Sequence, residues 1–408
     1  MLYMKSWNKR ESIGYRIILA VLILLCACFL THSYAENVLS VGDKGEEVLR
    51  MKQRLQELRY IKEGSLTKKF TEKTELSLKD FQRNNGLEET GKLDPVTREL
   101  LFSDQAAGMP YPTMKPLAAL RPLSETIGPE VDAEGFLLGD GEFIYENDDE
   151  GAWIYLNANL QITIRRGEDS SIPLVWFETE IMTRNGEAFR TVMTDPDHPG
   201  SKFQYPYVIA RAEHFVLGFT DDFYATRMDD HETVGVIIRN GKIISDQTNR
   251  KTGTHLPNLD MMAQYSDGRL MVYACNEYTA EELLANGAVN VFSFGPVLLR
   301  GGQINEMVYR SFRSIEPRQA LGMIEPNHYL LISVQGRTSF SKGTNLQRVA
   351  EMMRERGVTE ALNLDGGNTM ALIFRGRMLN KKARYQNRKF VRSVTSLIGI
   401  GYTEDQVY

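Results

Sequence analysis

A proline-rich stretch divides this 408-residue chain into two parts whose apolar residues follow different periods. Residues 106–123 are rich in proline and carry few charges, which predicts a stiff, extended linker. We place the bounds of this linker at residues 104 and 123. A single core rarely grows beyond ~250–300 residues, so the chain must form at least two domains. The prolines of the stretch are Pro110, Pro112, Pro116 and Pro122.

The overall composition is that of folded protein. Hydrophobic residues make up 42% of the chain and charged residues 25%, which argues against wholesale disorder. The net charge of -5 gives no basic surface of the kind that nucleic-acid binders carry, so no nucleic-acid partner is predicted. A polyanionic ligand would have to be met by local arginines instead.

The first 35 residues predict a signal peptide or a membrane anchor. A basic stretch precedes the apolar run Ile17–Leu30, and Ser33-Tyr34-Ala35 offers a cleavage site between small residues. Without cleavage, residues 14–31 would hold the protein at the membrane. We therefore expect an exported protein of the cell wall or the extracellular space that contacts the membrane only through this segment.

Residues 39–103 predict a small all-α domain of three helices. The amphipathic segments are Glu46–Tyr60, about Thr71–Asn84, and one that begins at Asp94-Pro95, a cap followed by proline at the first helical position. The spacing places these residues on the inner faces: Val48, Met51, Leu55, Leu58, Leu78, Phe81, Val96 and Leu100.

The same region resembles the peptidoglycan-binding domain of the three-helix type, which implies peptidoglycan as a partner. Members often carry Asp-Gly before the second helix where this chain has Thr67-Lys68-Lys69-Phe70, so the polarity of the groove would differ. A plain helical spacer is the alternative reading. The resemblance rests on Val41-Gly42-Asp43-Lys44-Gly45, Gln53, Gln56, Phe81-Gln82, Gly86-Leu87 and Thr90-Gly91.

Beyond the linker the chain predicts an α+β domain with a mixed, mostly antiparallel sheet. We divide it into a strand-rich part at 124–214 and a main part at 215–404. Capping boxes begin helices at Thr279 and at Thr344, and a buried strand, Glu360–Leu364, is followed by a return strand, Met370–Phe374. The earlier β-rich runs are Trp153–Leu156, Leu160–Ile164 and Leu174–Phe177.

The sharpest local feature is the run Asn363–Thr369. It places the Asp365 carboxylate at a strand end beside Gly366 and Gly367, which can adopt positive φ and form an anion-accepting nest. On spacing alone, a structural turn and a functional site are equally good readings.

The order of several motifs in this part of the chain resembles the phosphodiester glycosidase family from about Phe215 to Tyr402. Upstream, this chain has Thr220-Asp221-Asp222 where the family has an Asn-Gly-Asp motif, so only Asp222 matches. This difference leaves open an altered specificity or a lost activity. The motifs are Ser293-Phe294-Gly295-Pro296, Arg318-Gln319-Ala320-Leu321-Gly322, Gly336-Arg337, Gly343-Thr344, Asn363-Leu364-Asp365-Gly366-Gly367-Asn368 and Arg392.

The resemblance implies hydrolysis of an N-acetylglucosamine-1-phosphodiester-like bond at the anomeric carbon. Asp222 and Asp365 would be the catalytic pair, with their roles as nucleophile, acid or base unassigned. Arg318 would grip the phosphate as a bidentate fork. The remaining candidates for binding phosphate or sugar are Arg337, Arg392, Ser293, Gly295, Thr344, Asn363, Gly366, Gly367 and Asn368.

No cofactor is predicted, although Asp365 could also hold a divalent ion, and we expect a monomer. A non-catalytic protein that binds cell-wall glycan or teichoic acid is the alternative function. A peptidoglycan amidase or lytic enzyme is disfavoured, because the downstream domain shows neither a His/Asp zinc pattern nor a Cys-His arrangement.

Overall fold

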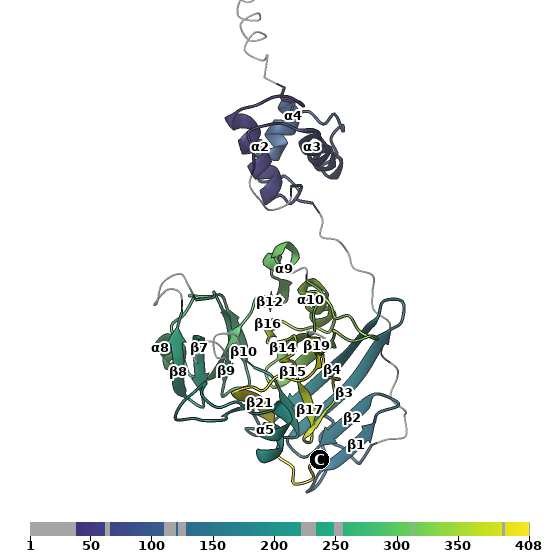
Figure 1. The fold of residues 1–408 in the computed structure, drawn as a ribbon, viewed down its shortest axis with the longest axis vertical. Helices are drawn as coiled ribbons and strands as arrows, with labels where there is room; N and C mark the ends of the chain where they lie inside the picture. Colours follow the sequence, from purple (N-terminus) through teal and green to yellow (C-terminus); the bar gives the residue numbers. More distant parts are fainter. Residues whose placement is uncertain are drawn as a thin grey trace, which may run out of the picture. The chain divides into compact units, whose positions relative to one another are not determined.

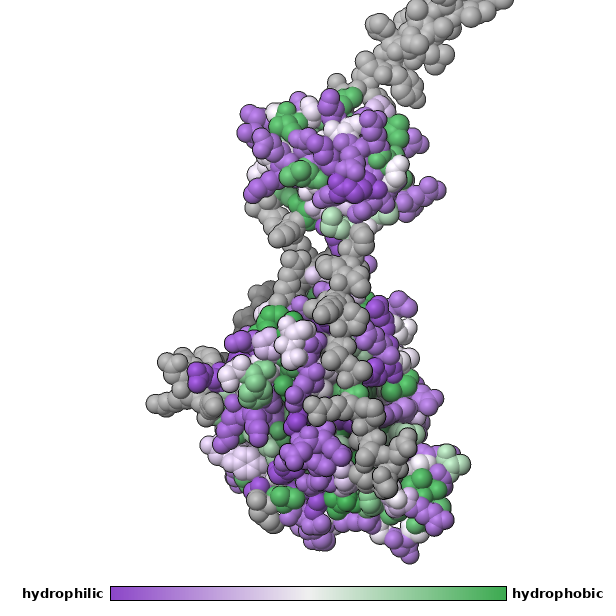
Figure 2. Space-filling model, turned by 90° about the vertical axis from the view of Figure 1, so that its right-hand side faces the viewer, coloured by the Kyte–Doolittle hydropathy of each residue, from purple (hydrophilic) through white to green (hydrophobic). Residues whose placement is uncertain are grey.

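The computed structural model divides the chain into two compact units, residues 1–113 and 114–408. The predicted signal segment and Asp222 lie outside the residues it describes. On the face shown in Figure 2, hydrophilic side chains dominate the surface of each unit. The described residues are 38–61, 66–109, 120, 128–221, 234–248, 256–311, 314–385 and 388–407.

The described part of the first unit contains three helices, as predicted: α2 (Glu46–Glu57), α3 (Glu72–Asn84) and α4 (Pro95–Leu101). Local capping sets two of the helix starts. The Thr71 hydroxyl accepts a hydrogen bond from the Thr74 amide, and the Asp94 carboxylate accepts one from Thr97 at 2.8 Å. Within the described residues, no helix is long and apolar enough to cross a membrane.

The predicted inner faces of the first two helices are confirmed, and that of the third is confirmed at Leu100, which packs against the core, but is wrong at Val96. Val96 is 63% exposed and Leu100 only partly buried, whereas Thr97 and Leu101 are buried. The Thr97 hydroxyl accepts a hydrogen bond from the buried Gln82 amide at 3.0 Å, which fixes the rotation of α4. The inward residues that are fully buried are Val48, Met51, Leu55, Leu78 and Phe81, while Leu58 is partly buried.

The second unit is built from antiparallel sheets (Figure 1). In sheet order, the largest has nine strands: β1 (Phe143–Asn147), β2 (Ala152–Leu156), β3 (Leu160–Asp169), β4 (Leu174–Thr183), β15 (His328–Gln335), β14 (Arg318–Glu325), β16 (Glu360–Leu364), β12 (Val297–Arg300) and β13 (Gln303–Ile304).

Two five-stranded sheets and a short ribbon complete the unit. The second sheet is β10 (Leu270–Tyr273), β9 (Asp260–Tyr265), β11 (Ala288–Phe294), β7 (Gly235–Arg239) and β8 (Lys242–Gln247). The third is β18 (Arg377–Met378), β17 (Leu372–Phe374), β6 (Leu217–Phe219), β21 (Ser396–Ile400) and β5 (Arg190–Met193). The ribbon pairs β19 (Arg384–Tyr385) with β20 (Arg388–Lys389).

The sheets share one apolar core, and helices cover their other faces. On β15, Tyr329 and Leu331 join this core, while Leu330 and Ile332 on the opposite face pack in the cluster that contains α10, as the two-residue period of a strand requires. The covering helices are α5 (Pro206–Ala212), α8 (Ala280–Ala285), α9 (Glu306–Ser311) and α10 (Leu346–Glu355).

The α+β, mostly antiparallel prediction is confirmed, with three corrections. Every pairing among the described strands is antiparallel, so the parallel component of a mixed sheet is not seen there. The strand after the glycine turn, β17, pairs with β6 in the third sheet and does not return beside β16. The N-cap of α10 is Asn345, because Thr344 forms a backbone bridge with Glu316.

Candidate active site

Asp365 lies where the chain leaves β16 and passes to the third sheet. Leu364 is paired with Gln319 on β14, so the Asp365-Gly366 peptide runs beside the start of that strand. A Cβ atom on Gly366 would lie 2.5 Å from the Pro317 carbonyl oxygen, so only glycine fits at this approach. The Gly367 amide donates to the same carbonyl at 3.1 Å. The turn that carries the carboxylate is therefore packed directly against β14.

Arg337 approaches this turn from the loop after β15. Its Nε donates to the Glu316 carboxylate at 2.8 Å, and its guanidinium also donates to the Asn368 side-chain oxygen. A Cβ atom on Gly367 would lie 3.6 Å from the Arg337 guanidinium. Arg337 itself has φ of 53°, a left-handed conformation uncommon outside glycine and asparagine. The backbone thus accepts a strained position that brings this cation to the glycine turn.

Arg318 is the second cation, and protein atoms orient it. Its Nε donates to the Thr344 carbonyl at 3.3 Å, and one terminal nitrogen donates to the carbonyl and hydroxyl of Ser314 at 2.9 and 2.8 Å. Burial lowers the pKa of the Arg318 guanidinium, the Glu316 carboxylate opposes this shift and Arg337 adds to it. Two partly buried guanidinium groups, of which only Arg337 is paired with Glu316, favour a bound anion.

A buried polar layer fixes the backbone of Asp365. The Thr220 hydroxyl donates to the Gln319 side-chain oxygen and lies 3.2 Å from the Asp365 carbonyl. The Gln319 amide in turn donates to Ser333 at 3.0 Å and to the Ala371 carbonyl at 3.1 Å. The Asp365 amide donates to the Asp221 carbonyl at 3.2 Å. Three segments distant in sequence therefore position this one residue.

The departure at Thr220-Asp221 from the family motif has a structural counterpart. Asp221 is 3% exposed, and its carboxylate forms a buried ion pair with Arg239 at 3.3 Å. Arg239 also donates to the Val291 carbonyl at 2.7 Å. A buried carboxylate is tolerated when a partner of opposite charge and further hydrogen bonds compensate its desolvation.

Four other predicted residues lie at three different places. Arg392 joins the turn, because its amide donates to the Asn368 carbonyl at 3.0 Å and its guanidinium lies 3.5 Å from the Thr369 hydroxyl. Asn363 and Gly295 contact each other on the β16 side, where the Asn363 amide donates to the Gly295 carbonyl at 2.8 Å. Ser293 is fully buried and donates to the Val236 carbonyl at 2.7 Å, which directs its hydroxyl toward β7.

The sequence prediction missed the supporting residues Glu316, Gln319, Thr220 and Arg239 as contributors to the site. Arg239 had a usable signal, since an arginine that ends the apolar run Val236-Ile237-Ile238 predicts a buried charge in need of a partner. The other three contacts join segments far apart in sequence and left no local pattern. No group of three or more His, Cys, Asp or Glu side chains that could hold a metal ion occurs in the described part of the chain.

Comparison with known families finds one match within each unit. Residues 214–401 match the family model "Phosphodiester glycosidase", and residues 44–101 match "Putative peptidoglycan binding domain". The chain thus carries a phosphodiester glycosidase-family domain preceded by a domain of the peptidoglycan-binding type, as the sequence motifs predicted. The match supports a hydrolase-like family for this domain.

Individual relatives are distant. The SPbeta prophage-derived uncharacterized protein YomE of Bacillus subtilis is 25% identical over 177 residues, which cover 43% of this chain and 26% of YomE. The zebrafish N-acetylglucosamine-1-phosphodiester alpha-N-acetylglucosaminidase catalytic domain overlaps 64% of this chain and 83% of its own, at 18% identity and a TM-score of 0.43. A hypothetical protein from Synechocystis overlaps 60% of this chain and 62% of its own, at 14% identity and a TM-score of 0.42.

Proposed function

We propose that this protein is an exported cell-envelope hydrolase that cleaves a sugar-1-phosphodiester of the N-acetylglucosamine-1-phosphodiester kind. One observation carries the proposal: the glycine turn that bears Asp365 is packed against the start of β14, where Arg318 lies, and is bonded to Arg337. The match of residues 214–401 to the phosphodiester glycosidases supports the same reaction class.

The proposed chemistry divides between the carboxylates and the arginines. Arg318 and Arg337 would hold the phosphate, because guanidinium groups donate two parallel hydrogen bonds to phosphate oxygens. The phosphate ester leaves as a stable anion, so the chief demand is to stabilise an oxocarbenium-like transition state at the anomeric carbon. Asp365, with Asp222 as the second carboxylate, would meet that demand. A separation of ~5–5.5 Å between the two carboxylates would give retention of configuration at the anomeric carbon, and a separation of ~6.5–9.5 Å would give inversion.

The helical unit would bring this activity to the cell wall. Its match to a peptidoglycan-binding model supports binding to peptidoglycan, and the basic and then apolar segment at residues 1–35 supports export as part of the proposal. We expect the full chain to sediment with purified peptidoglycan at both low and high salt. Absence of co-sedimentation under both conditions would refute wall binding and leave the hydrolase proposal intact.

Two variants test the reaction on a sugar-1-phosphodiester. Asp365→Asn should abolish turnover with little change in melting temperature, because Asp365 lies at a strand end and not in an apolar core. Arg318→Lys keeps the positive charge but cannot form the bidentate contact that a guanidinium group makes to phosphate. The loss of one charge-assisted hydrogen bond, worth ~1.5–3 kcal/mol, predicts a roughly ten- to hundredfold fall in kcat/KM. On an aryl glycoside without phosphate, Arg318→Lys should lose far less.

Arg269→Lys is the matched control, since Arg269 pairs with Asp267 at an exposed position and should leave both substrates unaffected. Equal losses on both substrates for Arg318→Lys would make Arg318 a scaffold residue. Wild-type turnover in Asp365→Asn would remove Asp365 from the mechanism. A chain that binds wall glycan but turns over no phosphodiester would establish the alternative, a non-catalytic binding protein.

A further inference from the structure

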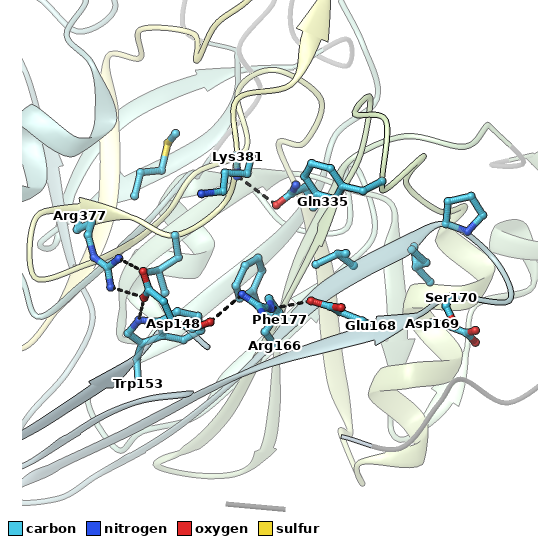
Figure 3. Close-up of a pocket in the computed structure, with 16 residues that line it drawn as sticks. Asp148, Trp153, Arg166, Glu168, Asp169, Ser170, Phe177, Gln335, Arg377 and Lys381 are labelled. Atoms are coloured by element: carbon cyan, nitrogen blue, oxygen red, sulfur yellow. Dashed lines mark hydrogen bonds and ion pairs between the residues drawn. The ribbon is translucent and has the colours of Figure 1, made fainter. Parts of the chain in front are cut away.

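A pocket of about 560 Å³ opens in the second unit beside the strands that precede the family-matched residues (Figure 3). Sixteen residues line it, and ten of them fall between Asp148 and Phe177, on and around β2, β3 and β4. The match to the phosphodiester glycosidases begins only at residue 214. Most of the pocket wall is therefore supplied by a part of the chain to which the family model assigns no role.

The pocket combines aromatic and aliphatic surface. Trp153 and Phe177, core residues whose rings are almost fully buried with centroids 6.0 Å apart, are among the lining residues, and Phe340, 48% exposed, lines the pocket from the loop after β15. Met378, on β18, and Leu379, which follows that strand, add aliphatic side chains to the lining. Apolar faces with a few fixed polar groups are typical of sites for small organic ligands, and the C–H faces of a pyranose ring pack on such surfaces.

The charges in the pocket are balanced and mostly fixed in pairs. Both terminal nitrogens of Arg377 donate to the Asp148 carboxylate at 2.8 Å, and Arg166 pairs with Glu168 at 2.9 Å, as Figure 3 shows. Equal numbers of acidic and basic side chains favour a neutral ligand over a phosphate. The arginines proposed to bind phosphate, Arg318 and Arg337, do not line this pocket. The ionisable side chains that line the pocket are Asp148, Glu168 and Asp169 against Arg166, Arg377 and Lys381.

A buried hydrogen-bond donor also lines the pocket. Gln335 is 2% exposed, and its side-chain oxygen accepts from the Lys381 backbone amide at 3.1 Å. This bond fixes the orientation of the Gln335 amide, because a backbone N–H can only donate. The Gln335 Nε2 is then a donor that finds no acceptor among the described residues. A hydroxyl or carbonyl oxygen of a ligand would supply one.

The pocket adjoins the candidate active site through one loop. Gln335 ends β15 and lines the pocket, and Arg337, two residues later, bonds to Asn368 at the glycine turn. Phe340 of the same loop lines the pocket again. The Ser341 hydroxyl anchors the loop to β4 by accepting from the Val175 amide at 3.0 Å. A glycan attached to a phosphodiester at the arginines could therefore extend along this loop.

We infer that the pocket is a subsite for a neutral saccharide unit of the substrate, packed on Phe340 and hydrogen-bonded by Gln335. This inference rests on the proposed function, since it assigns the subsite to the glycan that carries the scissile linkage. It also places most of the wall of this subsite on residues 148–177, upstream of the family-matched part of the chain.

The test is a calorimetric titration of the full chain with chitotetraose, a neutral tetrasaccharide of N-acetylglucosamine. Phe340→Ala should weaken binding by about tenfold or more, because it removes an exposed aromatic face. Tyr205→Ala is the matched control, since Tyr205 is 46% exposed and does not line the pocket, so its affinity should equal that of the wild type. Hydrogen exchange should show protection of residues 377–381 in the presence of chitotetraose.

Undetectable binding to the wild-type chain, or equal affinity of Phe340→Ala and wild type, would overturn the inference. Binding by the helical unit alone would give that second result, because Phe340 lies in the other unit. The titration involves no turnover, so it separates the two proposals. A chain that binds chitotetraose through Phe340 and cleaves no phosphodiester would refute the proposed reaction and retain the subsite.

Discussion

Replacement of Gly366 by alanine tests whether the glycine turn positions the Asp365 carboxylate, which we propose to be catalytic. The added Cβ would lie 2.5 Å from the Pro317 carbonyl oxygen and 3.4 Å from the Arg318 Cα, both backbone atoms. A backbone carbonyl at the start of β14 cannot rotate aside as the end of a flexible side chain could. We therefore expect the turn itself to move and to stretch or lose the Gly367 hydrogen bond to Pro317.

The expected cost follows from these two contacts. Overpacking of this kind costs ~1–3 kcal/mol, and a lost hydrogen bond ~0.5–1.5 kcal/mol, so Gly366→Ala should lower the free energy of unfolding by about 2–4 kcal/mol. At ~2–4 °C per kcal/mol, the melting temperature should fall by roughly 4–16 °C. A displacement of Asp365 by ~1 Å should reduce kcat/KM by about a hundredfold.

Thermal unfolding and kcat/KM on a sugar-1-phosphodiester measure the two effects, and Gly128→Ala is the control. A Cβ on Gly128 would meet no atom within 4 Å, so this variant should match the wild type in both measurements. If Gly366→Ala melted within about 1 °C of the wild type and kept full turnover, far outside the range for overpacking, the close approach to Pro317 would not constrain the site.

Two further predictions concern stability. Leu101→Ala should lower the free energy of unfolding of the helical unit by ~2–5 kcal/mol. Val96→Ala, at a position that is 63% exposed, should change that free energy by no more than ~0.5 kcal/mol. If urea unfolding gave equal losses of stability for the two variants, the observed rotation of α4 would be contradicted. Burial raises the pKa of Glu187 above its ordinary value of 4.5, so ionisation of Glu187 makes the folded chain lose stability as the pH rises through that raised pKa. Glu187→Gln should therefore gain stability relative to the wild type above the raised pKa but not at about pH 4, and urea unfolding that gave the same difference at pH 4 and pH 7 would contradict this cause.

The sequence predicted those features that depend on neighbours within one helical turn. The caps at Asp94 and Thr279 are confirmed, because each cap joins a side chain to a backbone amide three residues later. Runs of β-branched and aromatic residues bounded by turn residues likewise predicted β2, β3 and β4, which the structure contains. Local periodicity and capping chemistry were therefore sufficient for element type and approximate position.

Features that depend on distant partners could not be predicted in the same way. Val96 and Leu101 both fit a buried position by spacing, and only the bond from Gln82 to Thr97, made across the helical unit, selects the latter. Thr344 has the side chain of an N-cap, but its backbone is engaged by Glu316, so the cap moves to Asn345. In both cases a tertiary hydrogen bond overrides a local preference.

The same reasoning explains why the candidate site lies where a sequence-based expectation was wrong. A return strand beside β16 would have satisfied the backbone after Asp365 through ladder hydrogen bonds, but the chain crosses to the third sheet instead. Backbone groups at the crossover are bonded by Asp221, Pro317 and Thr220 from other segments. Those bonds hold the carboxylate-bearing turn in one conformation, and fixed geometry of this kind is what a catalytic group requires. The crossover that local patterns could not predict is therefore the feature that holds the turn bearing Asp365 against the start of β14 and against Arg337.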